Sequence, residues 1–109
     1  MKHLIFTILE NGPKCEKVLM SLSKAGYNGT VIASTSLKHT LANEGEIPMF
    51  FNLALIESNK FENNTTLYIV AEEHEVDDVK KIIKSHTENF EKCKGGMFVV
   101  PLESFEGSF

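Results

Sequence analysis

The segment that decides the fold is His3–Leu9, with the sequence HLIFTIL. Successive side chains of a β-strand point to opposite faces of the sheet, and both faces of this segment are mostly apolar. This pattern predicts a central strand that is covered on both sides. Residues 11–13, NGP, end the strand, and a proline suits the first turn of a helix.

Patterns of the same kind predict two helices and three further strands around this strand. Apolar residues at i, i+3, i+4 and i+7 predict a helix that starts at Pro13 and ends at Gly26. A second amphipathic helix is predicted from Glu75 to about His86. The further strands are predicted at residues 30–35, 65–71 and 97–100, with a turn at residues 94–96.

The resulting order of elements is β-α-β-β-α-β, which is typical of the ferredoxin-like α+β fold. We therefore predict a four-stranded antiparallel sheet with two helices on one face, in a single domain that spans residues 1–109. The two helices can cover only one face of this sheet, although three of its strands are apolar on both faces. The second face carries Phe6, Tyr68 and Phe98, and we expect copies of the chain to cover it in a trimer.

A long segment separates the second predicted strand from the third, at about residues 36–64. Its polar first part, Ser36–Glu46, is expected to be mobile without a ligand. Residues 47–56 are apolar nearly all round and are predicted to form an extra helix. This helix would pack on the domain or a neighbouring subunit, or dock on a protein partner. Insertion into a membrane is less favoured, because the basic flank that it requires is thin.

Composition excludes several classes of function. The 109 residues include 15 acidic and 11 basic side chains, for a net charge of −4, and every basic side chain is a lysine. An acidic chain without arginine is poorly suited to bind nucleic acid. The chain lacks an apolar run long enough to span a membrane, and its start does not resemble a signal peptide. Two cysteines make no disulfide framework, so a reduced, cytoplasmic protein is expected.

Three stretches resemble the PII-like signalling superfamily, whose members are ferredoxin-like trimers that bind nucleotides between subunits. The stretches Thr30–Thr35, Asn64–Glu73 and Lys94–Phe105 are similar to the branch of cyclic-di-AMP receptors. The loop lengths are instead those of the nitrogen-regulatory PII proteins, in which the long loop between strands two and three docks on partner proteins. The resemblance implies a bacterial regulatory protein.

The superfamily also implies a set of ligand-binding residues. A threonine early in its second strand contacts the bound base, and Thr30 stands at that position. A glycine-rich turn before its last strand binds phosphates through backbone N–H groups, and Lys94–Gly96 stands there. The full set of ligand-binding residues that we predict is Thr30, Ser34, Thr35, Lys38, Lys94, Gly95 and Gly96.

The chain departs from the superfamily at two places. Residues 36–38, SLK, stand where nitrogen-regulatory members have glycines and a glutamine at the base of the loop. Glu103, Ser104 and Glu106 stand where those members have arginines, and these acidic side chains would repel a triphosphate. We therefore expect a small anionic effector that is a nucleotide. We do not expect ATP to bind in the way that is usual for the nitrogen-regulatory proteins. Its binding would change how the long segment contacts a target protein, such as a membrane transporter or an enzyme, and no cofactor is implied.

Two other functions are compatible with the fold. A trimeric metal-tolerance protein of the CutA type would need a cluster of ligands, and His3, His39, His74 and His86 share no such spacing. A small enzyme of the ferredoxin-like barrels could use His39 or His86 as a base, supported by Thr7 and Tyr68 in a sheet-facing cavity. No catalytic or metal-binding residues are predicted, and we do not expect the chain to be an enzyme.

Three local groups have a structural and a chemical interpretation. Residues 72–75, EEHE, are a solvated turn that favours the next helix, or a set of metal ligands. Cys15 is expected to pack inward from the first helix. Cys93 lies between two lysines, which could lower its pKa and make the thiol reactive.

Overall fold

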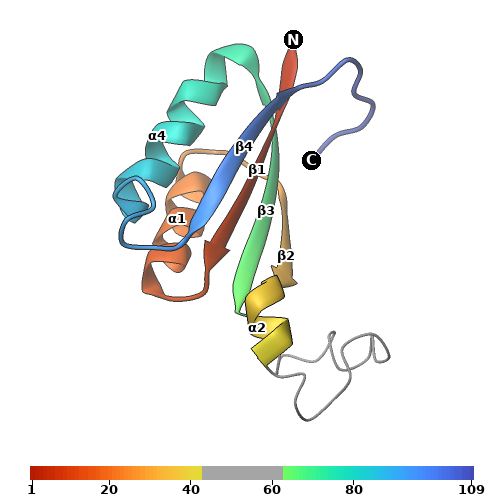
Figure 1. Ribbon diagram of the computed structural model, residues 1–109. Helices are drawn as coiled ribbons and strands as arrows, with labels where there is room; N and C mark the ends of the chain where they lie inside the picture. The colour runs from red at the N-terminus through yellow and green to blue at the C-terminus, as the bar shows by residue number, and fades with distance from the viewer. Residues whose placement is uncertain (43–62) are drawn as a thin grey trace.

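The computed structural model describes residues 1–42 and 63–109. The strands form one antiparallel sheet in the order β2-β3-β1-β4, and the helices α1 and α4 lie together on one side of it (Figure 1). This arrangement confirms the ferredoxin-like α+β fold, with a short helix α2 between β2 and β3. The elements are β1 (Lys2–Glu10), α1 (Pro13–Lys24), β2 (Thr30–Ser34), α2 (Leu37–Ala42), β3 (Asn64–Glu72), the 3-10 turn η1 (Glu73–Glu75), α4 (Val76–Thr87) and β4 (Gly95–Pro101).

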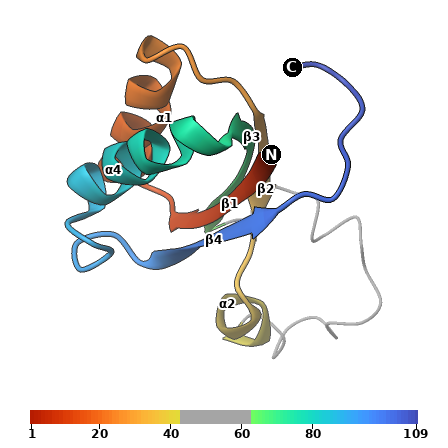
Figure 2. The same ribbon diagram turned by 90° about the horizontal axis from the view of Figure 1, so that it is seen from above.

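The predicted central strand, β1, pairs with β3 on one side and with β4 on the other. Its odd-numbered side chains Ile5, Thr7 and Leu9 are buried under the helices. Its even-numbered side chains point to the opposite face, where Phe6 lies across from Tyr68 and Phe98. In the described part of the chain, therefore, the long helices α1 and α4 cover one of the two apolar faces and leave the other without a helix over its aromatic rings (Figure 2).

The hydrophobic core lies between the sheet and the two long helices. Val18 and Leu22 of α1 and Val79 and Ile83 of α4 are buried against apolar side chains of β1 and β3. The helices also share a polar contact, because Ser21 Oγ and His86 Nε2 lie 2.8 Å apart. His86 thus contributes to the contact between the two long helices.

The predicted turn at Lys94–Gly96 is wrong, because Gly95 and Gly96 belong to β4 and pair with Leu9 and Ile8. The sheet continues to this point because the N–H of Glu10 donates a 2.8 Å hydrogen bond to the carbonyl of Lys94. Gly95 has a φ of +154°, and a Cβ atom there would lie 1.8 Å from the carbonyl oxygen of Ile8. Close approach of β4 to β1 therefore requires this glycine.

The polar part of the long segment begins with helix α2, which the sequence did not predict. Ser36 initiates this helix, because its Oγ accepts a 3.0 Å hydrogen bond from the N–H of His39. Its carbonyl also accepts a 2.9 Å bond from the N–H of Thr40. The helix lies apart from α1 and α4, beyond the end of β2 (Figures 1 and 2). The predicted helix at residues 47–56 lies outside the described residues.

Helix α4 ends in an unusual backbone turn. Glu88, Asn89 and Phe90 have φ values of 51°, 57° and 67°, which is a left-handed conformation that side chains disfavour. Buried Thr87 supports the turn, because its Oγ1 accepts a 3.2 Å hydrogen bond from the N–H of Phe90. None of the helices in residues 1–42 and 63–109 is long and apolar enough to cross a bilayer.

Candidate functional site

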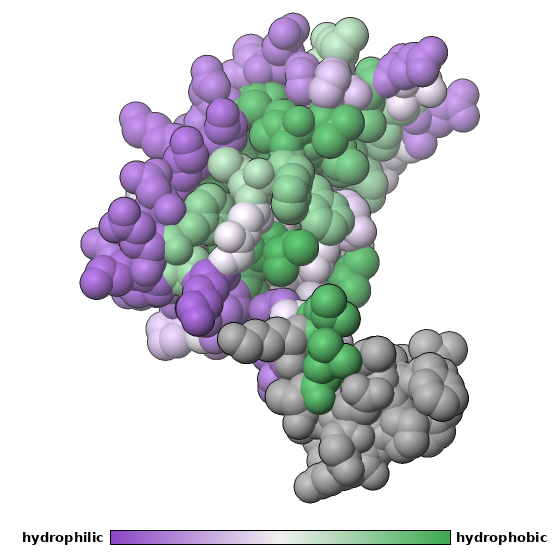
Figure 3. Space-filling model, in the orientation of Figure 1, coloured by the Kyte–Doolittle hydropathy of each residue, from purple (hydrophilic) through white to green (hydrophobic). Residues whose placement is uncertain are grey.

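The face of the sheet opposite the helices carries a cluster of aromatic rings, which we call the open face. The rings of Phe6 and Tyr68 meet edge to face, with centroids 4.8 Å apart and planes at 79°. The ring of Phe98 lies 5.8 Å from that of Phe6 on the other side. Figure 3 shows apolar residues gathered over the strands, with hydrophilic residues concentrated over α4.

Large apolar side chains at both edges of the open face are exposed to solvent. Phe98 is 55% exposed and Val100 is 46% exposed on β4, and Ile32 is 44% exposed on β2. Together with the aromatic cluster they place apolar side chains on all four strands of this face. Such a surface is typical of a contact with another protein surface.

One cavity brings the two ends of the long segment together with the start of β4. It has a volume of about 590 Å³, and we call it the segment-base cavity. Because the end of β2 pairs with the start of β3 here, the residues on either side of the segment become neighbours. The cavity is lined by Ile8, Glu10, Ser36, His39, Asn63, Asn64, Lys94 and Gly95.

Hydrogen bonds of Asn63 connect the two ends of the long segment. Its side-chain Oδ1 accepts a 3.0 Å hydrogen bond from the N–H of Ser36, and its own N–H donates a 3.1 Å bond to the carbonyl of Ser34. Its carbonyl accepts a 2.9 Å bond from the N–H of Asn11. One residue thus connects the end of β2, the beginning of β3 and the loop after β1, and it fixes one wall of the cavity.

Glu10 and Lys94 form another wall and exchange two hydrogen bonds. In addition to the backbone bond described above, Glu10 Oε1 accepts a 2.9 Å hydrogen bond from the N–H of Lys94. A backbone amide at the predicted phosphate-binding position is therefore engaged by a carboxylate of the same chain. The residues that line the cavity thus include an acidic residue, Glu10, a basic residue, Lys94, and a histidine, His39.

The predicted ligand-binding residues do not all lie at one place, and Gly96 of β4 is not among the residues that line the segment-base cavity. Lys94 and Gly95 line the segment-base cavity. Ser34 and Thr35 lie next to it at the end of β2, where Ser34 Oγ is 2.9 Å from Thr66 Oγ1 and Thr35 Oγ1 is 3.3 Å from Thr40 Oγ1. Lys38 belongs to α2, and its side chain lies outside the described part of the structure.

Thr30 lies away from this cavity. It is exposed at the start of β2, on the edge of the sheet opposite to Gly96 of β4. Since β3 and β1 lie between these edges, about 14 Å separates the two strands. A single chain therefore does not bring Thr30 to the glycines of β4. The acidic tail residues Glu103 and Glu106 also lie at the far end of the sheet, because the N–H of Leu102 bonds to the carbonyl of Lys2.

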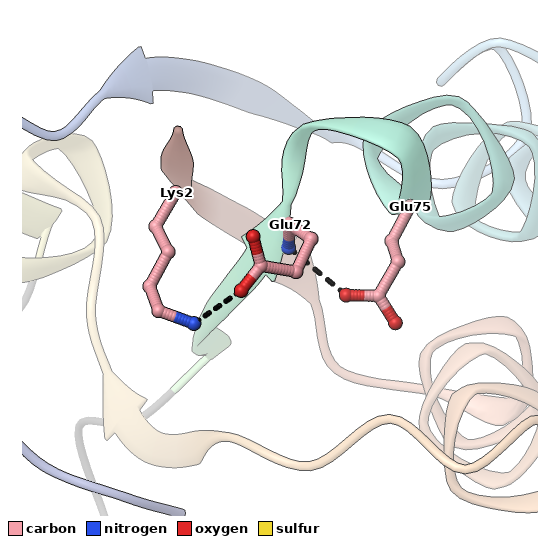
Figure 4. A network of polar contacts seen from close by, with 3 residues as sticks. All are labelled: Lys2, Glu72 and Glu75. Atoms are coloured by element: carbon pink, nitrogen blue, oxygen red, sulfur yellow. Dashed lines mark hydrogen bonds and ion pairs between the residues drawn. The ribbon is translucent and has the colours of Figure 1, made fainter.

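The acidic group at residues 72–75 has a structural role in the chain. The N–H of Glu72 donates a 2.9 Å hydrogen bond to Glu75 Oε1, and the Glu72 carboxylate pairs with Lys2 (Figure 4). The hydrogen bond and charge of Lys2 lower the pKa of Glu72. Glu72 and Glu75 together cap η1. Across residues 1–42 and 63–109, no three His, Cys, Asp or Glu side chains are grouped to hold a metal ion.

The features that would favour the other functions are not brought together. Thr7 is buried on the helix side of the sheet, whereas Tyr68 belongs to the open face, so they do not share a cavity. Cys15 and Cys93 are both 2% exposed. Burial raises the pKa of each thiol, and Glu10 raises that of Cys93 further. The alternative of a reactive Cys93 with a lowered pKa is therefore contradicted, because desolvation outweighs the opposing effect of Lys14.

Sequence reasoning did not assign six of the eight lining residues to the ligand site, among them Glu10 and Asn63. The sequence indicates Glu10 only as the end of the first strand, and Asn63 only as part of the turn before the third. Both are polar residues at strand ends, and the register of β1 against β3 places Glu10 directly opposite Asn64. A register deduced from the alternating apolar residues could have identified that pair.

The comparisons with known proteins identify a similar fold and no family. No known family model matches the chain, and a comparison with curated proteins finds no match. A protein of unknown function from Pediococcus pentosaceus ATCC 25745 has a similar crystal structure, with a TM-score of 0.64 and 16% sequence identity. The alignment covers 98% of this chain and 97% of that chain. The two proteins therefore share the ferredoxin-like fold over nearly their whole length.

Proposed function

We propose that the chain is a PII-like regulatory protein of the cytoplasm that binds a small anionic effector, a nucleotide, in the segment-base cavity. The observation that carries this proposal is the lining of the cavity. Gly95 begins β4 and Lys94 immediately precedes it, whereas His39 comes from α2, at the start of the long segment. A ligand in this cavity would contact the rigid sheet and the segment at the same time.

Such a ligand would act on the segment through α2. Lys94 supplies a positive charge for an anion, and the side-chain amides of Asn63 and Asn64 can donate to and accept from a base. A ligand that contacts both walls binds better to the arrangement in which α2 lies against the sheet. It would shift the segment toward that arrangement and change what the segment offers to a target protein.

The open face supports an assembly of several copies, which we propose to be a trimer. Its apolar side chains need a cover, and a second copy offers the same apolar surface. The edges of the sheet are β2 and β4, so an edge-to-edge arrangement of copies would bring the strand of Thr30 in one copy next to the strand of Gly96 in the next. Thr30 would then contribute to a site between subunits that it cannot reach within its own chain.

A thermal-shift measurement with a nucleotide panel tests the proposal. AMP, ADP, ATP and cyclic dinucleotides are each added to the wild type and to the Lys94→Gln and Lys92→Gln variants. Lys92 is a matched control, because it is exposed two residues away and lines a different cavity. A ligand at 100 times its Kd stabilises the folded state by about 2.7 kcal/mol. We expect one or more nucleotides to raise the Tm of the wild type and of Lys92→Gln, and less so that of Lys94→Gln. If none raises the Tm of the wild type, the proposal is wrong.

A further inference from the structure

A carboxylate of the chain itself, that of Glu10, lies at the wall of the segment-base cavity. Glu10 lines the cavity, and its Oε1 lies 2.9 Å from the backbone nitrogen of Lys94. Backbone N–H groups at such positions commonly bind the oxygens of a phosphate or carboxylate ligand. Here the carboxylate of Glu10 accepts that hydrogen bond from within the chain.

The backbone keeps Glu10 in this position. Its N–H donates to the carbonyl of Lys94, and its own carbonyl lies 3.7 Å from the Sγ of Cys93. The end of β1 is therefore attached to the residues before β4 at three points, two through the backbone of Glu10 and one through its side chain. A ligand could displace the side chain, but the carboxylate would stay at the wall of the cavity.

The charges that line the cavity set a limit on the ligand. Lys94 contributes one positive charge and Glu10 one negative charge, so the two fixed charges cancel. His39 adds a positive charge only when its imidazole is protonated. A triphosphate, with several negative charges, would therefore find little net attraction here and direct repulsion from Glu10.

We propose that Glu10 determines the charge selectivity of the segment-base cavity, so that it accepts nucleotides with a single phosphate and discriminates against polyphosphates. This inference rests on the proposed function, because it concerns the ligand of the same cavity. It assigns to Glu10 a specificity-determining role that is separate from its backbone contacts.

Calorimetric titration with AMP, ADP and ATP tests the proposal on the wild type, Glu10→Gln and Glu16→Gln. The first substitution keeps a side-chain oxygen that can accept the Lys94 N–H, and it removes the charge. Glu16→Gln removes the same charge from an exposed position on α1 and controls for the net charge of the chain. We expect the wild type to bind AMP more tightly than ATP. We expect Glu10→Gln to reduce this preference by about tenfold, and Glu16→Gln to leave it nearly unchanged.

Three results of this titration would contradict the role of Glu10 in charge selectivity. A wild type that binds ATP as tightly as AMP overturns the inference, whatever the variants do, and leaves the proposed function standing. A preference for AMP that Glu10→Gln changes no more than Glu16→Gln also overturns it, because the selectivity then has another source. If neither the wild type nor Glu10→Gln binds any of the three nucleotides, this inference is wrong together with its premise of a nucleotide site.

Discussion

The phenol of Tyr27 donates a 2.7 Å hydrogen bond to Asp78 Oδ2 and thereby connects the loop after α1 to the first turn of α4. The hydrogen bond to Asp78, with burial and the charges of Asp78 and Glu75, raises the pKa of Tyr27 to about 12. The folded state thus favours the protonated phenol. Its contribution to stability is complete below the unfolded pKa of about 10 and is lost as the pH rises toward 12.

Replacement of Asp78 by Asn should therefore lower the pKa of Tyr27 toward its ordinary value. Ultraviolet absorbance of tyrosinate during an alkaline titration measures this, and Tyr27→Phe identifies which of the two tyrosines is observed. We expect Tyr27→Phe to reduce stability at neutral pH by about 0.5 kcal/mol, since the bond is exposed to solvent. An unchanged titration in Asp78→Asn would show that the hydrogen bond does not cause the shift.

Replacement of Phe98 by Glu should disrupt self-association without unfolding the chain. Phe98 is 55% exposed in the single chain, so a charge there has little effect on the core. In an assembly that buries the open face, the same charge would be desolvated without a partner. Light scattering of the wild type should show a trimer at micromolar concentration, and of Phe98→Glu a monomer.

The matched control for this experiment is Met20→Glu. Met20 is 58% exposed, but it lies on α1, on the helix side of the sheet. We expect this variant to assemble like the wild type. A wild type that is monomeric at micromolar concentration would contradict the proposed assembly and, with it, any site between subunits.

The two glycines of β4 should respond differently to substitution. Gly95→Ala should destabilise the protein by about 3 kcal/mol, because its Cβ would collide with the backbone of Ile8. The nearest contact of a Cβ at Gly96 is the ring of Phe98 at 3.9 Å, so Gly96→Ala should change stability by less than about 0.5 kcal/mol. Denaturant unfolding of both variants measures the difference.

Gly96→Val extends this experiment to ligand binding. The space around Gly96 lets the variant fold, and the branched side chain would keep an anion away from the backbone. We expect it to unfold like the wild type but to show a smaller thermal shift with the nucleotide that the wild type binds. Equal thermal shifts would mean that Gly96 has no part in the site.

Glu88→Gly should stabilise the protein by about 1 kcal/mol. Glu88 has a φ of 51°, and a left-handed conformation costs a residue with a side chain about 1 kcal/mol relative to glycine. Its carboxylate also lies at the C-terminus of α4, where a negative charge is unfavourable. We expect the Tm to rise by about 4 °C. A lower Tm would mean that the Glu88 side chain makes a contact worth more than the strain.

The regular part of the fold could be predicted because its information is local. Alternation in residues 3–9 and the apolar face of Cys15, Val18 and Leu22 are visible in the sequence, and both are confirmed. Gly95 is misplaced by the sequence pattern because glycines usually indicate turns, whereas here the cause is a contact with Ile8 on the neighbouring strand β1. Helix α2 was missed because its start depends on the Ser36 hydroxyl rather than on an apolar pattern.

The candidate site was harder to predict than the fold. Lys94 and Gly95 were identified through a family resemblance, but the contact of Lys94 with Glu10 spans 84 positions and depends on the pairing of β1 with β4. The raised pKa of Cys93 likewise depends on burial, which neighbouring lysines in the sequence do not reveal. Charges and pKa values at a site are thus properties of the tertiary structure.

Asn63→Ala should release the base of the long segment. The side-chain Oδ1 of Asn63 accepts the N–H of Ser36, and Ser36 in turn caps α2 through His39. Loss of this contact leaves the start of α2 without its support from β3, and we expect faster amide hydrogen exchange in residues 36–42. The matched control is Asn64→Ala, which shortens the neighbouring side chain of the cavity and leaves the Asn63 contacts in place.

The same measurement decides whether the segment is a switch or a fixed insertion. The proposed function predicts that residues 36–46 exchange rapidly in the wild type without an effector, and that the nucleotide with the largest thermal shift slows this exchange. Because the nucleotide would contact His39 on α2 and Lys94 just before β4, its effect should be strongest at the first turn of α2. Slow exchange that the nucleotide does not change would mean that α2 is permanently docked. The effector would then have no means of acting through this segment, and the regulatory proposal would have to be abandoned.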